Sequence, residues 1–201
     1  MNKIGFKIAL VNLIFLFIFS ACKKTDSTEG FDTMLFSDDT TAAAELVSQA
    51  NEDLNKIKVM YKKNEVQLED LKAAMSEKDT EKVKKITEDL VYLINDGMSL
   101  GEKAIEKIEQ AEAMNINADF KEYLDLKAES LQKQMDAFEN RRQAARLLRD
   151  SFGTADPATI EKAKGEFKSR EEKFIKTMEE AQQISKKAND FAKESSKKVK
   201  D

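Results

Sequence analysis

The chain has 201 residues, of which 36% are charged, and 34 basic against 38 acidic side chains give a net charge of −4 at pH 7. It has one cysteine, one proline and no histidine or tryptophan, which excludes a disulfide framework and the commonest general base. The acidic balance argues against nucleic acid as a partner, because a phosphate backbone binds basic surfaces. A composition rich in Ala, Glu, Lys and Leu predicts long helices and an all-α fold.

The first 21 residues have the build of a secretory signal peptide. Lys3 and Lys7 make its start basic, and residues 8–19 are apolar except for Asn12. The stretch between Lys7 and Cys22 is shorter than the roughly 20 residues that a helix needs to cross a bilayer. We therefore expect residues 1–21 to be a cleaved leader, and a permanent transmembrane anchor is the weaker interpretation.

The leader ends in Phe19-Ser20-Ala21-Cys22, which places the only cysteine directly after two small residues. This junction resembles the lipobox of bacterial lipoproteins, with Ser20, Ala21 and Cys22 at matching positions and Phe19 where that family usually has leucine. The resemblance implies that Cys22 carries covalent fatty acids such as palmitate, and we expect no other cofactor. Stable anchoring needs two or more acyl chains, which a triacylated cysteine supplies. The alternative is ordinary cleavage that leaves Cys22 unmodified.

Residues 22–41 are expected to hold the lipidated cysteine and a flexible tether. Lys23 and Lys24 follow the cysteine, and by the same resemblance the absence of an aspartate there favours the outer membrane. Residues 31–36 are too apolar for a free tether. We expect them to fold back onto the first helix, and the alternative is a segment that binds a partner.

Residues 42–201 show the apolar spacing of four helices, expected at about 42–75, 80–114, 118–151 and 157–199. In the first helix this spacing alternates between three and four residues, which predicts a narrow buried seam: Ala43, Val47, Ala50, Leu54, Ile57, Tyr61, Leu68, Leu71 and Met75. Asn64 interrupts that seam, and we interpret it as a buried residue that sets the alignment of the helices. The second helix has a wider apolar stripe and is expected to touch two neighbours. Its Gly97 and Gly101 either admit a close neighbour or mark a bend.

The remaining helix ends also carry signals. Asn117 is expected to cap the third helix, Gly153 to stop it, and Asp156 with Pro157 to start the fourth. Connections of a few residues between helices this long favour antiparallel neighbours. The predicted fold is therefore an elongated, coiled-coil-like antiparallel four-helix bundle with up-down-up-down topology.

Four of the five arginines fall close together near the end of the third helix: Arg141, Arg142, Arg146 and Arg149. The last three are spaced to share one helix face. Guanidinium groups on one face could bind a phosphate, a sulfated glycan or an acidic partner. The alternative is structural, with these arginines complementing the helix dipole and pairing with acids on neighbouring helices.

No pattern in the sequence indicates an enzyme or a metal site. Paired carboxylates such as Glu52-Asp53 and Glu179-Glu180 are expected to lie on solvated faces, because carboxylates become reactive only when a pocket desolvates them. Side chains of the size found in these seams usually fill a bundle, so a ligand cavity is a lesser interpretation.

These patterns lead to one expected function and two alternatives. The chain is expected to be a non-enzymatic lipoprotein of the cell envelope, attached to a membrane through Cys22 and presenting helix surfaces to other envelope or extracellular proteins. The first alternative is a surface-exposed adhesin or antigen that binds a host or anionic ligand. The second is a carrier of an apolar small molecule inside the bundle.

Overall fold

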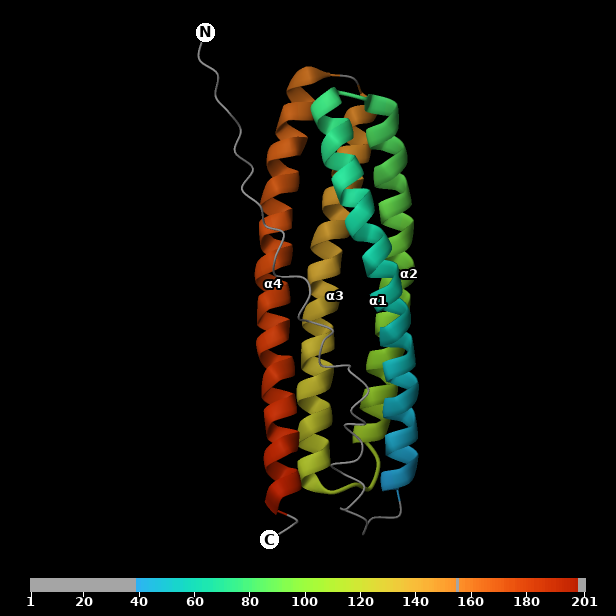
Figure 1. The fold of residues 1–201 in the computed structure, drawn as a ribbon, viewed down its shortest axis with the longest axis vertical. Helices are drawn as coiled ribbons and strands as arrows, with labels where there is room; N and C mark the ends of the chain where they lie inside the picture. Colours follow the sequence, from blue (N-terminus) through green and yellow to red (C-terminus); the bar gives the residue numbers. More distant parts are fainter. Residues whose placement is uncertain (1–38, 155, 199–201) are drawn as a thin grey trace.

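The computed structural model describes residues 39–154 and 156–198, and the side chains of residues 63–65 and 196–198 lie outside that description. All regular structure in the described part is helical: α1 (Thr40–Glu77), α2 (Thr80–Glu112), α3 (Ala118–Gly153) and α4 (Pro157–Lys198). The helices lie alongside one another in a bundle that is much longer than it is wide (Figure 1). The predictions of an all-α fold and of four helices are confirmed.

Polar side chains cap the start of three helices, and two of them, Asn117 and Asp156, are the caps that the sequence predicts. The carboxylate of Asp79 accepts a hydrogen bond from the Lys82 N–H at the start of α2. The side chain of Asn117 accepts from the Phe120 N–H at the start of α3, at 2.8 Å. Asp156 accepts from both the N–H and the hydroxyl of Thr159 at the start of α4, at 3.0 and 2.6 Å. Each bond satisfies a backbone or hydroxyl donor in the first turn, where backbone N–H groups have no partner within the helix.

The end of α3 differs from the prediction, and α1 ends in a cap that was not predicted. Gly153 does not stop α3 as a left-handed residue, because the helix includes it and ends at Thr154, which has φ of −83°. The Thr154 hydroxyl donates to the Ser151 carbonyl at 2.8 Å and so completes that end. The left-handed cap lies instead at Lys78, after α1, with φ of 57°. There the N–H of Asp79 donates to the Ala74 carbonyl at 3.0 Å and closes the turn.

The buried side chains follow the predicted seams. In α1 six seam residues are buried and Leu54, Leu68 and Met75 are half-buried, while the side chain of Asn64 lies outside the described residues. In α3 the apolar residues that recur every three or four positions are buried, except for Ala128, which is half-buried: Phe120, Leu124, Leu131, Met135, Phe138, Ala145 and Leu148. The helices therefore pack through the narrow apolar stripes that the sequence shows.

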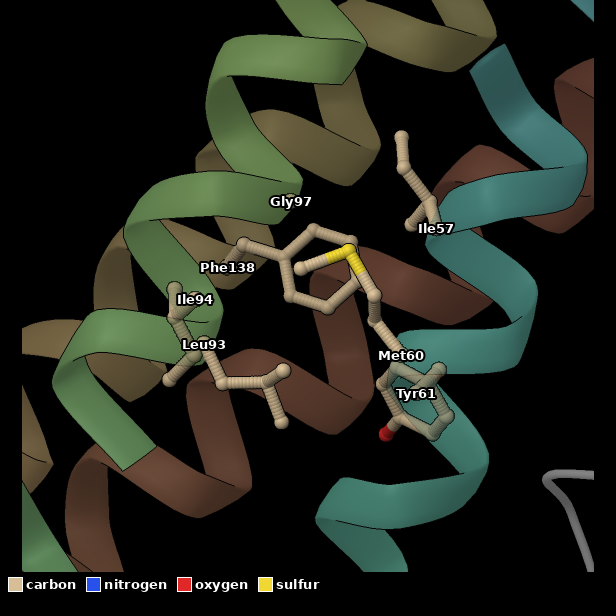
Figure 2. A pocket seen from close by; sticks show the side chains of 7 residues that line it. All are labelled: Ile57, Met60, Tyr61, Leu93, Ile94, Gly97 and Phe138. Carbon is tan, nitrogen blue, oxygen red and sulfur yellow. The ribbon is translucent and has the colours of Figure 1, made fainter. Parts of the chain in front are cut away.

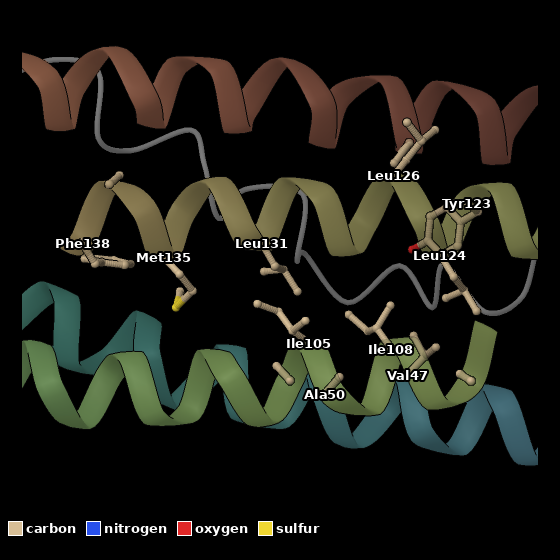
Figure 3. Close-up of a cluster of buried hydrophobic side chains, with 14 of the residues drawn as sticks. Val47, Ala50, Ile105, Ile108, Tyr123, Leu124, Leu126, Leu131, Met135 and Phe138 are labelled. Carbon is tan, nitrogen blue, oxygen red and sulfur yellow. The ribbon is translucent and has the colours of Figure 1, made fainter. Parts of the chain in front are cut away.

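The apolar core has two parts. The first apolar cluster contains Tyr61, Ile94, Phe138 and Phe174 and extends toward the start of α1. The second apolar cluster contains Leu71, Leu90, Leu148, Phe152 and Ala163, at the end where α1 joins α2. Figure 3 shows part of the first cluster, where residues of α1, α2 and α3 meet while Leu126 points to α4 on the other side of α3.

Consecutive helices pack against each other: α1 with α2, α2 with α3, and α3 with α4. The prediction that α2 touches two neighbours is confirmed. A methyl group added to Gly101 would lie 2.2 Å from the Met135 sulfur, so this glycine makes room for the Met135 side chain of α3, whereas an equivalent methyl group on Gly97 would meet nothing within 4 Å. Within the described part of the chain, the Cα atoms of α1 and α4 do not come within 8 Å of one another.

Candidate functional site

The predicted lipidation site, Cys22, lies outside the described residues, as do Phe19, Ser20 and Ala21 of the junction and the apolar segment 31–36. The structure therefore bears on the arginines, on the carboxylates and on the core. Among the residues it describes, no helix is both long and apolar enough to cross a membrane.

Arg141 faces the inside of the bundle and is only 5% exposed. Its guanidinium donates to both carboxylate oxygens of Glu171 in α4, at 3.0 and 2.8 Å, and to the hydroxyl of Tyr61 in α1, at 2.6 Å. The same group lies over the ring of Phe174. Arg141 thus links three helices, at a point between the first and second apolar clusters.

This arginine keeps its charge although it is buried. Burial alone would lower the pKa of Arg141, but the oxygen atoms of Tyr61 and Glu171 outweigh that effect and raise it. The bidentate pairing matches the planar fork of a guanidinium. Because these donors already have partners inside the bundle, Arg141 is not available to a ligand at the surface.

The other three arginines share no partner with Arg141. Arg142 is half-buried, donates to Asn95 of α2 at 3.0 Å and pairs with Glu139 of its own helix. Arg149 pairs with the neighbouring Asp150 at 2.8 Å, and this hydrogen bond raises the pKa of Arg149.

Arg146 is exposed and forms no ion pair with any side chain that the structure describes. The four arginines are therefore not assembled into one surface cluster. A ligand that binds at this end of α3 would meet one open guanidinium and two that are already engaged.

The prediction that Glu52 and Asp53 both lie on a solvated face is wrong for Asp53. Asp53 is not solvated but only 5% exposed, and it accepts from Lys56 at 2.8 Å and from Lys107 of α2 at 2.6 Å. These two hydrogen bonds lower the pKa of Asp53, although burial acts in the opposite direction. Glu52 and Glu179 are exposed, and the half-buried Glu180 lies 3.8 Å from Lys133 of α3. Asp53 is thus an ionised partner in a contact between α1 and α2.

A small apolar pocket lies between α1, α2 and α3 beside Gly97. It is lined by Ile57, Met60, Tyr61, Leu93, Ile94, Gly97 and Phe138, and its volume is about 20 Å³ (Figure 2). That space holds roughly one water molecule. In this conformation the pocket cannot hold a lipid or another small molecule of drug size, which needs about 300 Å³ or more.

The acidic side chains of the described helices form no group of three that could hold a metal ion. Comparison with protein-family models, with curated proteins and with solved structures finds no match to this chain.

Proposed function

We propose that this chain is a lipid-anchored protein of the bacterial cell envelope, and that its helical domain acts as a non-enzymatic scaffold or interaction module. The observation that carries the proposal is the junction Phe19-Ser20-Ala21-Cys22 behind a basic and apolar leader. Diacylglycerol on the Cys22 thiol and a fatty acid on its freed amino group would supply three acyl chains. At about 0.8 kcal/mol per buried CH₂, these chains hold a protein stably on a bilayer.

We further propose that the bundle has antiparallel up-down-up-down topology. Only Lys78 and Asp79 separate α1 from α2, and the connections after α2 and α3 are almost as short. Helices of this length joined so tightly are expected to run in opposite directions. The carboxylate of Asp39 accepts from the Asn115 N–H at 2.9 Å, which brings the start of α1 beside the connection between α2 and α3, as this topology requires.

The proposed topology explains how the domain could be presented to partners. The start of α1 and the end of α4 lie at the same end of the bundle in Figure 1. A tether from Cys22 would then attach the bundle by one end and leave its long sides free. We propose the outer membrane as the location, because Lys23 and Lys24 replace the aspartate that would favour inner-membrane retention.

The test is metabolic labelling of the full chain with radioactive palmitate in a bacterial host, followed by separation of the membranes. The wild-type chain is expected to take up the label and to sediment with the outer membrane. Cys22→Ser should remove the label and release the protein from the membrane fraction. Lys23→Ser, next to the cysteine, is the matched control and should be labelled as the wild type is. An unlabelled wild-type chain would reject the proposal.

Neither alternative function has a specific observation in its favour. The adhesin interpretation relied on grouped arginines, and Arg141 is engaged inside the bundle. The carrier interpretation needs a cavity, and the pocket beside Gly97 has room for about one water molecule. Protease treatment of intact cells separates a surface-exposed domain, which would be cleaved, from one that faces the periplasm.

A further inference from the structure

The outward face of α1 carries a row of exposed apolar side chains. Val59 is 59% exposed and Val66 is 63% exposed, and they lie seven residues apart. Ala73, which is also exposed, follows after another seven residues. Seven residues are nearly two helical turns, so all three lie on one face, opposite the buried Ile57 and Leu71. Single exposed apolar residues are common and need no partner, so the case for a contact depends on how the charged residues between them are arranged.

Charged residues lie within this row in a symmetrical arrangement. Lys62 is four residues before Val66 and Asp70 is four residues after it, and both are exposed. Val59 and Ala73 lie at equal distances on either side of Val66. The face therefore matches itself when a second copy of the helix is turned end to end around Val66.

We propose that this face of α1 binds the same face of α1 in a second copy of the chain, in an antiparallel arrangement with the two-fold axis at Val66. In this pairing Val66 meets Val66, Val59 meets Ala73, and Lys62 meets Asp70 twice. The contact is self-complementary, as a two-fold symmetric interface must be.

The charges disfavour the parallel arrangement of the same two faces. Parallel pairing would place Lys62 against Lys62 and Asp70 against Asp70, and like charges across a helix pair are destabilising. Antiparallel pairing converts the same residues into two attractive contacts. Charge complementarity thus selects both the partner, which is a second copy, and its direction.

Three small apolar side chains per copy make an interface well below the standard of about 800 Å² per partner, so the dimer is expected to be weak. The first test therefore uses disulfide capture, which traps a weak dimer covalently. The full chain carries Cys22→Ser, so it has no native thiol and the result does not depend on whether Cys22 is lipidated. Single cysteines are then introduced as Val66→Cys, Val59→Cys or Tyr92→Cys, and the proteins are oxidised. Tyr92 on α2 is the matched control, since it is also 63% exposed.

Val66→Cys is expected to form a disulfide-linked dimer, because the residue lies on the symmetry axis. Val59→Cys should form none above the Tyr92→Cys control, because the two copies of residue 59 lie about 21 Å apart in the antiparallel pair. Combining Val59→Cys with Ala73→Cys should restore the dimer. Equal yields from Val66→Cys and Tyr92→Cys would overturn the proposal, and so would a dimer from Val59→Cys alone that matches Val66→Cys.

The second test reverses the charges in the Val66→Cys background. Lys62→Glu and Asp70→Lys, each alone, turn both attractive contacts into repulsive ones and should lower the dimer yield by about fivefold. Together they restore opposite charges, and the yield should return to that of the parent. A double variant as low as either single variant would overturn the proposal. Circular dichroism of each variant checks that these exposed substitutions leave the helices intact.

Discussion

The guanidinium carbon of Arg141 lies 3.6 Å from the centre of the Phe174 ring. This distance places a permanent positive charge against an aromatic face inside a helical bundle, where the ring quadrupole attracts it. The same group is bonded to Glu171 and Tyr61, so its charge is compensated on the inside. Arg141 is therefore a structural residue, and its partners determine what its replacement does.

Removal of the Glu171 carboxylate is expected to destabilise the fold more than removal of Arg141. Glu171→Ala leaves a buried guanidinium without its anion and should lower the free energy of unfolding by about 2–3 kcal/mol. Arg141→Met fills similar space without a charge and leaves Glu171 within reach of water, so we expect a loss of about 1 kcal/mol. Urea denaturation measures both, with the exposed Glu172→Ala as the control. Equal losses for Glu171→Ala and Glu172→Ala would contradict the role of this pair.

The two glycines of α2 are expected to respond to alanine in opposite ways. Gly97→Ala adds a methyl group that meets nothing and should raise the free energy of unfolding by about 1 kcal/mol, as Gly165→Ala should on the exposed side of α4. Gly101→Ala must displace the buried Met135 side chain and should lower the free energy of unfolding by about 1 kcal/mol. Thermal unfolding compares the three variants.

A double-mutant cycle checks the cause of the Gly101 effect. Met135→Ala should cost less in the Gly101→Ala background than in the wild type, because the two side chains no longer compete for the same space. Additive losses would show that the methyl group on residue 101 acts in some other way.

Glycine at position 78 is expected to stabilise the bundle. Lys78 adopts a left-handed backbone conformation. This conformation costs a residue with a side chain roughly 1 kcal/mol, and glycine avoids that cost. Lys78→Gly should therefore raise the midpoint of thermal unfolding, by about 4 °C for 1 kcal/mol in a domain of this size. Lys78→Ala removes the same side chain but not the strain, so it should leave the midpoint nearly unchanged. A rise of the same size for alanine would mean that the lysine side chain, not the backbone, is the cause.

Acid is expected to destabilise the fold in part through Asp53. The hydrogen bonds from Lys107 and Lys56 hold the pKa of Asp53 below its ordinary value of 3.8, and bonds from Thr159 lower the pKa of Asp156 in the same direction. A carboxylate with a lowered pKa stabilises the fold above its unfolded pKa, and this stability is lost as the pH falls through the folded value. The free energy of unfolding should therefore decrease below about pH 4.

Asp53→Asn separates this contribution from the others. At neutral pH the variant should be less stable than the wild type by about 1 kcal/mol, because Lys107 loses its partner in α1. Its stability should then decline less steeply with acid, since residue 53 no longer binds a proton. Urea titrations at pH 7, 4 and 3 test both points, with Glu52→Gln as the neighbouring control. A slope for Asp53→Asn as steep as that of the wild type would refute this account.

The sequence predicts the helices well because their signals are local. The seam of α1, the caps at Asn117 and Asp156 and the wide stripe of α2 all depend on residues within a few positions of one another. The failed prediction at Gly153 and the cap at Lys78, which was not predicted, have local causes as well. At the end of α3 the Thr154 hydroxyl bonds to the Ser151 carbonyl, so the helix ends without a left-handed glycine. After α1, Lys78 adopts the left-handed conformation that its residue type does not favour.

The burial of Arg141 and Asp53, and the identity of their partners, could not be predicted from local signals. Arg141 follows Phe138 by three residues and precedes Ala145 by four, which puts it in the apolar seam, but charged residues are usually assigned to the surface. Its partners lie 80 and 30 positions away in the chain, and Lys107 lies 54 positions from Asp53. Sequence spacing within one helix does not show which turns of two different helices lie side by side.

The pattern in which each described helix packs on its chain neighbours has a consequence for how the protein folds. Each pair of consecutive helices can begin to pack next to its short connection, where the entropy cost of loop closure is lowest, and extend from there. Bundles built from such local contacts fold within microseconds to milliseconds. The hydrogen bond from Arg141 to Tyr61 spans 80 residues, and we expect it to form late, after the helix pairs have assembled.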